Sequence, residues 1–228
     1  MRRWILLPLL LAFASGCSLF EDKKTAIDDD DPRLKDIEHI PPAIPAPLAS
    51  FIERKEVSYD IQGRSVAELN EAMQKASPCI ASILHHENEK SVACTQSRFT
   101  LAHNDAPPNR VQGLCRTEQF RLRLRITITL PEWTNALDGH FGVADAWEFF
   151  HRALTRHEEG HANIAISEFI KFDQEVTQAL AQRPDSTCER KQRLFTKVWQ
   201  RSYRKVKQRN QEYDRRTANG VNNGTSFY

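Results

Sequence analysis

The sequence predicts an α+β fold in which a small antiparallel sheet packs against one long helix, with a further helix on its C-terminal side. The clearest strand signal is the strict alternation of apolar and polar residues over 120–130. The clearest helix signal is an apolar stripe at steps of three and four residues within 143–181, and a second helical stretch covers 186–216. About 210 residues remain after the leader, which suits one domain with its own core.

The first 16 residues have the pattern of a secretory signal that is removed from the mature protein. Arg2 and Arg3 precede an apolar run over 4–13, which is shorter than the about 20 residues of a membrane-spanning helix. Small residues then lead to Cys17, a pattern that resembles a bacterial lipoprotein signal, in which this cysteine becomes the lipidated first residue. An ordinary signal peptide is the alternative.

Residues 17–50 are predicted to form a disordered linker carrying the lipid anchor, because four aspartates at 28–31 precede a proline-rich stretch. Ser18 follows Cys17 where Asp would indicate retention at the inner membrane. By resemblance to enterobacterial lipoprotein sorting, the chain is expected at the outer membrane, facing the periplasm. Loss of the leader removes two of 32 basic residues and leaves 30 against 30 acidic ones, so no nucleic-acid partner is expected.

Four cysteines remain besides Cys17, and an even number in an exported chain predicts two disulfides with three possible connectivities. The preferred pairing is Cys79 with Cys94 as a local clasp and Cys115 with Cys188 between the sheet and the end of the long helix. A cysteine-rich zinc site is disfavoured, because no C-x-x-C pair occurs.

The folded domain begins near Glu53, with an alternating strand over 56–61 and a helix over 66–76, for which Ser65 is the expected N-cap. A second strand is predicted over 92–103, and a turn over 104–109. In the strand over 120–130 the apolar side chains face one way, and Arg and Thr side chains the other. Pro131 is expected to end that strand. The arginine row is interpreted as a solvated face, with substrate binding as the alternative.

The long helix places two imidazoles in the middle of its apolar stripe, His157 and His161, four residues apart. Burying them unpaired would cost about 1–3 kcal/mol each, so a partner is needed. Two hydrogen-bonded core histidines would satisfy this requirement, but one Zn²⁺ satisfies both rings at once. In the pattern His-Glu-x-x-His the carboxylate of Glu158 can meet a metal-bound water. Gly160, unfavourable in a helix, is expected to allow close approach of another element or a substrate.

The second helix carries eleven basic and three acidic residues between Glu189 and Arg216. Contact with lipopolysaccharide, another envelope polymer or nucleic acid is one interpretation. A charged outer helix face is preferred, because aromatic residues are sparsely interleaved with the charges.

The chain resembles a bacterial family of predicted secreted zinc-dependent proteases, otherwise known as a domain of unknown function, over roughly residues 53–220. The resemblance rests on Leu130-Pro131, Trp133, Trp147, the run from His157 to His161, and a late motif of Tyr213, Asp214, Thr217, Asn219 and Gly220. It implies a zincin-like metalloprotease domain over 51–220. It also implies His157 and His161 as zinc ligands and Glu158 as catalytic base. The polar, glycine-containing end of the chain predicts a flexible tail over 221–228.

The late motif of that family reads Tyr-Asp-x-x-Thr-x-His-Gly, and its histidine resembles a third zinc ligand. Asn219 stands at that position here, and an amide is a poor ligand for zinc. Asp214 is the preferred substitute. Glu168 lies about 10 Å along the helix from His161, too far to share its ion. The outside candidates are His103, His140 and His151.

Two functions follow from these residues. The first is a zinc-dependent peptidase of the cell envelope, acting on a peptide or protein substrate, with cell-wall peptides as one substrate class. The second is a non-catalytic, protease-like envelope lipoprotein that binds a partner or an anionic polymer through its basic helix. Asn219 favours the second function, and Glu158 favours the first.

Overall fold

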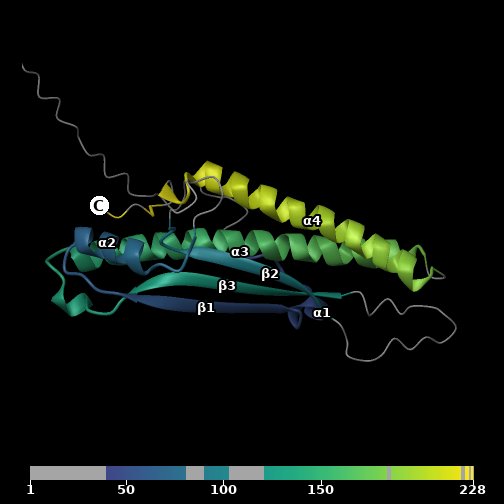
Figure 1. Ribbon diagram of the computed structural model, residues 1–228, viewed down its shortest axis with the longest axis horizontal. Coiled ribbons are helices and arrows are strands. Elements are labelled where there is room, and N and C mark those ends of the chain that lie inside the picture. The colour runs from purple at the N-terminus through teal and green to yellow at the C-terminus, as the bar shows by residue number, and fades with distance from the viewer. Residues whose placement is uncertain are drawn as a thin grey trace, which may run out of the picture.

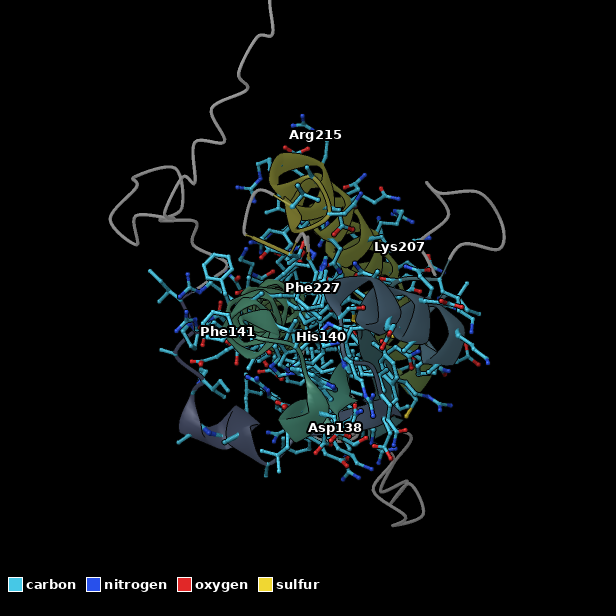
Figure 2. The ribbon with its side chains drawn as sticks, turned by 90° about the vertical axis from the view of Figure 1, so that its left-hand side faces the viewer. Asp138, His140, Phe141, Lys207, Arg215 and Phe227 are labelled. Atoms are coloured by element: carbon cyan, nitrogen blue, oxygen red, sulfur yellow. A yellow bond between two sulfur atoms is a disulfide. The ribbon has the colours of Figure 1, made fainter. Side chains whose placement is uncertain are left out.

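Two long helices lie in successive layers over one face of a three-stranded sheet with strand order β1-β3-β2 (Figure 1). The computed structural model describes residues 40–80, 90–102, 121–183, 186–221, 224, 225 and 227. Viewed end-on, α4, α3 and the sheet follow one another from top to bottom (Figure 2). The elements are α1 (Ala46–Ala49), β1 (Ile52–Ile61), α2 (Val66–Ala76), β2 (Cys94–Ala102), β3 (Arg121–Trp133), a 3₁₀ turn (Ala136–Asp138), α3 (Val143–Ala181) and α4 (Cys188–Thr217).

The α+β class and the two helices agree with the sequence prediction, but the sheet is mixed rather than antiparallel. β2 pairs antiparallel with β3, whereas β1 pairs parallel with it. The connection from β1 to β3 contains α2 and β2, which is long enough to return the chain to the starting end of the sheet. Alternation of side chains carries no information on strand direction, so the sequence pattern could not distinguish the two arrangements.

β3 continues past Pro131, where the strand was expected to end. Leu124 donates its backbone N–H to Phe51, on the β1 side. Alternate residues face opposite neighbours, so Pro131, which lacks an N–H, faces the β2 side. Pairing on that side ends at Cys94 and Thr129. Proline is tolerated here because its position lies at a locally unpaired edge.

The apolar face of β3 and the stripe of α3 form the core, as predicted. The buried residues of β3 include Leu122, Leu124, Ile126, Ile128 and Leu130. Those of α3 include Phe150, Leu154, His157, Ile164, Phe169 and Phe172. No helix in the described part of the chain is long and apolar enough to cross a membrane.

Order extends further than expected at both ends of the domain. α1 lies within the predicted linker over 17–50, and its Leu48 is buried in the core. In the tail, Phe227 is buried against Trp147 and Phe150, and its carbonyl accepts a hydrogen bond from Asn70. In both segments an apolar side chain fixes an otherwise polar or proline-rich stretch. The leader, Cys17 and the turn over 104–109 lie outside the described residues.

The disulfide between Cys79 and Cys94 is present as predicted, with Cα atoms 5.7 Å apart. It joins the segment after α2 to the first residue of β2. Cys188, at the start of α4, is also disulfide-bonded. Cys115, its preferred partner, lies outside the described residues.

A buried carboxylate joins α3 to α4. Glu168 Oε1 accepts hydrogen bonds from Lys171 Nζ and Arg209 Nη1, each at 2.9 Å. Burial alone would raise the pKa of Glu168, but these hydrogen bonds and positive charges outweigh that effect and lower it. The ionised Glu168 therefore links α3 to α4 through its contact with Arg209.

We expect Glu168→Gln to lower the free energy of unfolding by about 1–3 kcal/mol at pH 7, because charge-assisted hydrogen bonds are lost. A lowered pKa in the folded state gives stability that is complete above the unfolded pKa of about 4.3 and is lost as pH falls through the folded value. Urea unfolding of both proteins at pH 7 and below pH 4 measures the difference. If the difference in unfolding free energy between the two proteins is as large in acid as at pH 7, the Glu168 charge does not have this role.

Candidate metal centre

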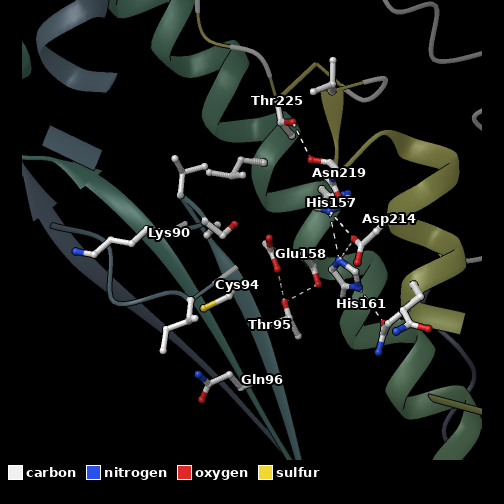
Figure 3. A pocket seen from close by; sticks show the side chains of 18 of the residues that line it. Lys90, Cys94, Thr95, Gln96, His157, Glu158, His161, Asp214, Asn219 and Thr225 are labelled. Atoms are coloured by element: carbon white, nitrogen blue, oxygen red, sulfur yellow. Dashed lines mark hydrogen bonds and ion pairs between the residues drawn. The ribbon is translucent and has the colours of Figure 1, made fainter. Parts of the chain in front are cut away.

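Two imidazoles project from the middle of α3 towards α4 (Figure 3). His157 and His161 lie one turn apart, and their Nε2 atoms are 3.3 Å apart. His157 is 5% exposed, because α4 and the loop after it cover this part of α3. The helical spacing therefore brings both ring nitrogens to one point, as the sequence predicted.

α4 supplies a carboxylate to the same point. The short connection between Ala181 and Cys188 turns α4 back along α3, which brings its C-terminal end over the middle of α3. Asp214 Oδ1 lies 3.0 Å from His161 Nε2 and 3.6 Å from His157 Nε2. Asp214, the substitute preferred from the sequence, is thus the third member of the cluster.

This group of two imidazoles and one carboxylate could hold a metal ion. A tetrahedral ion with ligands at about 2.0–2.1 Å separates them by roughly 3.3–3.4 Å. The three distances in the cluster, 3.0, 3.3 and 3.6 Å, centre on that value. The donors therefore fit three corners of a tetrahedron without rearrangement.

Asn210, one turn before Asp214 on α4, orients one of the rings. Its Oδ1 lies 2.9 Å from His161 Nδ1. An amide oxygen only accepts hydrogen bonds, so Nδ1 carries a proton, and the Nε2 lone pair becomes available when the proton facing Asp214 is lost. This arrangement is typical of a metal-binding histidine held by a second polar partner.

The electrostatics of the cluster favour an anionic Asp214. Burial alone would raise the pKa of Asp214, but hydrogen bonds with His157 and His161 outweigh that effect and hold it well below its usual range. Burial alone would lower the pKa of His161, whereas the hydrogen bond with Asp214 and the charge of Glu158 raise it overall. In the metal-free chain these shifts favour an ionised carboxylate paired with a protonated His161, so a cation that binds here would displace the ring proton from Nε2.

Glu158 lies beside the cluster but belongs to a different contact. It is buried, and its Oε2 lies 2.8 Å from the Thr95 hydroxyl of β2. The same hydroxyl lies 2.9 Å from the backbone carbonyl of Glu158. Thr95 follows Cys94, so the disulfide holds the strand residue that positions this carboxylate. Glu158 is thus held next to the three donors and is not one of them.

A pocket of about 650 Å³ opens onto these groups. Residues 92–96, at the entry to and start of β2, line one side, and Lys207 and Asn210 of α4 line the other. His157, Glu158, His161, Asp214 and Asn219 also line it. The candidate metal centre is therefore open to a ligand of small to moderate size.

Hydrogen bonds within the late motif build the end of α4. Thr217 donates its hydroxyl to the Tyr213 carbonyl at 2.9 Å and accepts the Gly220 N–H at 3.3 Å. The Asn219 N–H binds the Asp214 carbonyl at 2.7 Å. Asn219 has a φ of 55°, in the left-handed region that asparagine tolerates better than most residues. Asn219 thus helps to end α4 and lines the pocket, while the Asp214 carboxylate contacts the two imidazoles.

The other sequence candidates lie elsewhere. Glu168 is engaged with Lys171 and Arg209, as described above. His151 packs against the Trp147 ring, and the His140 N–H binds the Arg64 carbonyl. His103 lies outside the described residues.

The sequence reasoning missed two residues of the site, Thr95 and Asn210. Thr95 lies in a predicted strand, and only the tertiary packing of β2 on α3 reveals its contact with Glu158. Asn210 offered a signal, because it precedes Asp214 by four residues and so shares its helix face.

Fold and site together define an α+β protein whose long helix and C-terminal helix share a candidate metal centre. The chain belongs to the bacterial protein family of unknown function DUF922, which it matches over residues 57–220. The matched region runs from β1 to the loop after α4 and includes every residue of the centre. No curated protein and no solved structure matches the chain.

Proposed function

We propose that this protein is a zinc-dependent peptidase of the bacterial cell envelope, exported by residues 1–16 and anchored through Cys17. The observation that carries the proposal is the position of Glu158. Its carboxylate lies beside three metal-binding donors of His157, His161 and Asp214, on the wall of an open pocket. A purely structural metal site has no need of such a carboxylate.

Zinc is the ion best suited to this set of donors. Two imidazoles and one carboxylate are ligands that zinc accepts at tetrahedral spacing, and Ca²⁺ or Mg²⁺ would favour an all-oxygen set. Three protein ligands leave a fourth position for water or substrate, as in catalytic rather than structural zinc sites. A bound Zn²⁺ supplies Lewis acidity and lowers the pKa of a water molecule towards about 7.

The residues around the centre have distinct tasks in this proposal. Glu158 accepts a proton from the attacking water and passes it to the leaving amine. Thr95 keeps the Glu158 carboxylate in place through its hydroxyl. Asn210 holds His161 in the tautomer that leaves Nε2 available.

The edge of β2 is suited to hold the substrate. Among the described strands β2 pairs only with β3, and its residues 94–96 line the pocket. An extended peptide can add to a free strand edge through main-chain hydrogen bonds. A peptide bound there would pass Thr95 and bring a carbonyl group near Glu158.

Metal content tests the proposal directly. We expect elemental analysis of a soluble form beginning after Cys17 to find about one zinc per chain, and a His157→Ala/His161→Ala variant to hold none. Circular dichroism of both proteins would verify that the variant remains folded. If the unsubstituted chain holds no zinc after reconstitution at neutral pH, the proposal is wrong.

A chain without zinc would favour the non-catalytic alternative, a lipoprotein that binds a partner or an anionic polymer. The observation on that side is the outer face of α4, where Arg190, Lys197 and Arg204 are exposed. Binding of the zinc-free chain to an anionic envelope polymer, weakened by salt, would then be the expected result.

A further inference from the structure

The two imidazoles of the metal centre are held in different ways. A metal-binding histidine is usually oriented by a hydrogen bond at its second ring nitrogen. His161 has such a bond, to Asn210. His157 Nδ1 is buried, and no residue in the described part of the chain gives it a hydrogen-bond partner. On the Nδ1 side, the orientation of His157 therefore comes from packing.

That packing comes from Tyr213 and Gly220. The Tyr213 ring is fully buried and stacks on the His157 ring, with centroids 5.0 Å apart and planes 15° apart. The same ring meets His161 edge-on, at 5.0 Å and 88°. On the loop after α4, a Cβ atom at Gly220 would lie 3.1 Å from His157 Cγ, so the Gly220 backbone also packs closely on this ring.

Gly160 makes room for the Tyr213 ring. A methyl group added at Gly160 would lie 2.8 Å from Tyr213 Cε1 and still closer to its Cζ and hydroxyl oxygen. Glycine within a helix is otherwise unfavourable, because alanine is the better helix former. The tyrosine ring, the neighbour of Asp214 in sequence, thus reaches both imidazoles only because position 160 has no side chain.

We propose that Gly160, Tyr213 and Gly220 form an imidazole clamp that orients the metal-binding rings by packing. For His157 this packing takes the place of a hydrogen bond at Nδ1, and for His161 it adds to the bond with Asn210. The three clamp residues are positioning residues, since they act through the two imidazoles. The inference deepens the proposed function and rests on its metal site, but it does not depend on peptidase activity. It gives the glycine of the His-Glu-Glu-Gly-His run and the tyrosine of the late motif a common role.

The test compares four variants with the unsubstituted chain: Gly160→Ala, Tyr213→Leu, Tyr213→Phe and the Gly160→Ala/Tyr213→Leu pair. The readouts are zinc affinity by competition with a chelator, the absorption spectrum with Co²⁺ in place of zinc, and thermal unfolding of the metal-free proteins. Affinity is measured at a temperature at which every metal-free protein is folded. A loss of affinity then reports ring orientation and not unfolding.

We expect Gly160→Ala and Tyr213→Leu each to weaken zinc binding about 10- to 100-fold and to alter the Co²⁺ spectrum. Tyr213→Phe keeps the ring and should stay within about threefold of the unsubstituted chain. Gly160→Ala should lower the unfolding temperature of the native chain, through the clash, but raise it in the Tyr213→Leu background, through helix propensity. Zinc binding should stay weak in the pair, because the ring is absent.

Unchanged zinc affinity in Gly160→Ala and Tyr213→Leu would overturn the clamp, as would a Tyr213→Phe variant that loses as much affinity as Tyr213→Leu. If the unsubstituted chain binds zinc and cleaves no peptide, the proposed function fails while the clamp is still judged by the affinities. If the unsubstituted chain binds no zinc at all, both are overturned.

Discussion

Replacing Glu158 with glutamine should leave zinc bound and reduce peptide cleavage by about 10²- to 10⁴-fold, the usual contribution of a general base. Glutamine has nearly the same shape and can keep the contact with Thr95, but it cannot accept the proton of the attacking water. His157, His161 and Asp214 are untouched, so metal content is expected to stay the same. Cleavage of an unstructured protein, followed by mass spectrometry of the fragments, measures the effect alongside elemental analysis.

Glu159→Gln is the matched control, because it makes the same chemical change one residue further along the motif. The Glu159 side chain is 43% exposed and pairs with Arg54 at 2.9 Å, and it is not among the three donors. Exposed ion pairs of this kind contribute little to stability, so cleavage and metal content should both be nearly unchanged. Full activity in Glu158→Gln, or an equal loss in both variants, would exclude Glu158 as the base.

Periodicity predicted the elements of the fold well and their arrangement less well. The alternation in β3 and the stripe of α3 are set by burial of one face, which the sequence records residue by residue. The parallel pairing of β1 depends on how the connection through α2 and β2 travels in space, which no local pattern records. Pro131 illustrates the same limit, because its place in β3 depends on where the pairing between β3 and β2 ends.

The residues of the candidate site also fall into two groups, those that the local sequence predicts and those that only tertiary packing brings to the site. His157, Glu158 and His161 come from one turn and a half of a helix, so their spacing in sequence predicts their spacing in space. Asp214 could be preferred from its neighbourhood in the late motif, but its contact with the imidazoles depends on the antiparallel packing of α4 on α3. Thr95 comes from a third element, and nothing local to it indicates a role.

Each residue of the late motif has a physical role in this chain. Tyr213 packs on both imidazoles, Asp214 contacts them, and Thr217 links the Tyr213 carbonyl to the Gly220 N–H. Asn219 adopts a left-handed backbone at the helix end. The motif therefore does not need a histidine at position 219 to complete a group of three donors, and an active site is compatible with Asn219.

Asp214→Asn should weaken zinc binding by roughly 100-fold or more, because it removes the anionic ligand and leaves two imidazoles. Asn219→Ala, the matched control just after the end of α4, should stay within about threefold of the unsubstituted chain, because a neutral amide adds little to zinc binding. Chelator competition at about pH 7.5, with unfolding curves of the metal-free proteins, separates lost affinity from lost folding.

The reverse result, a strong loss of zinc affinity in Asn219→Ala and none in Asp214→Asn, would identify Asn219 and not Asp214 as the third ligand. Loss in both variants would mean that carboxylate and amide hold the ion together, and zinc with three protein ligands would no longer describe the centre.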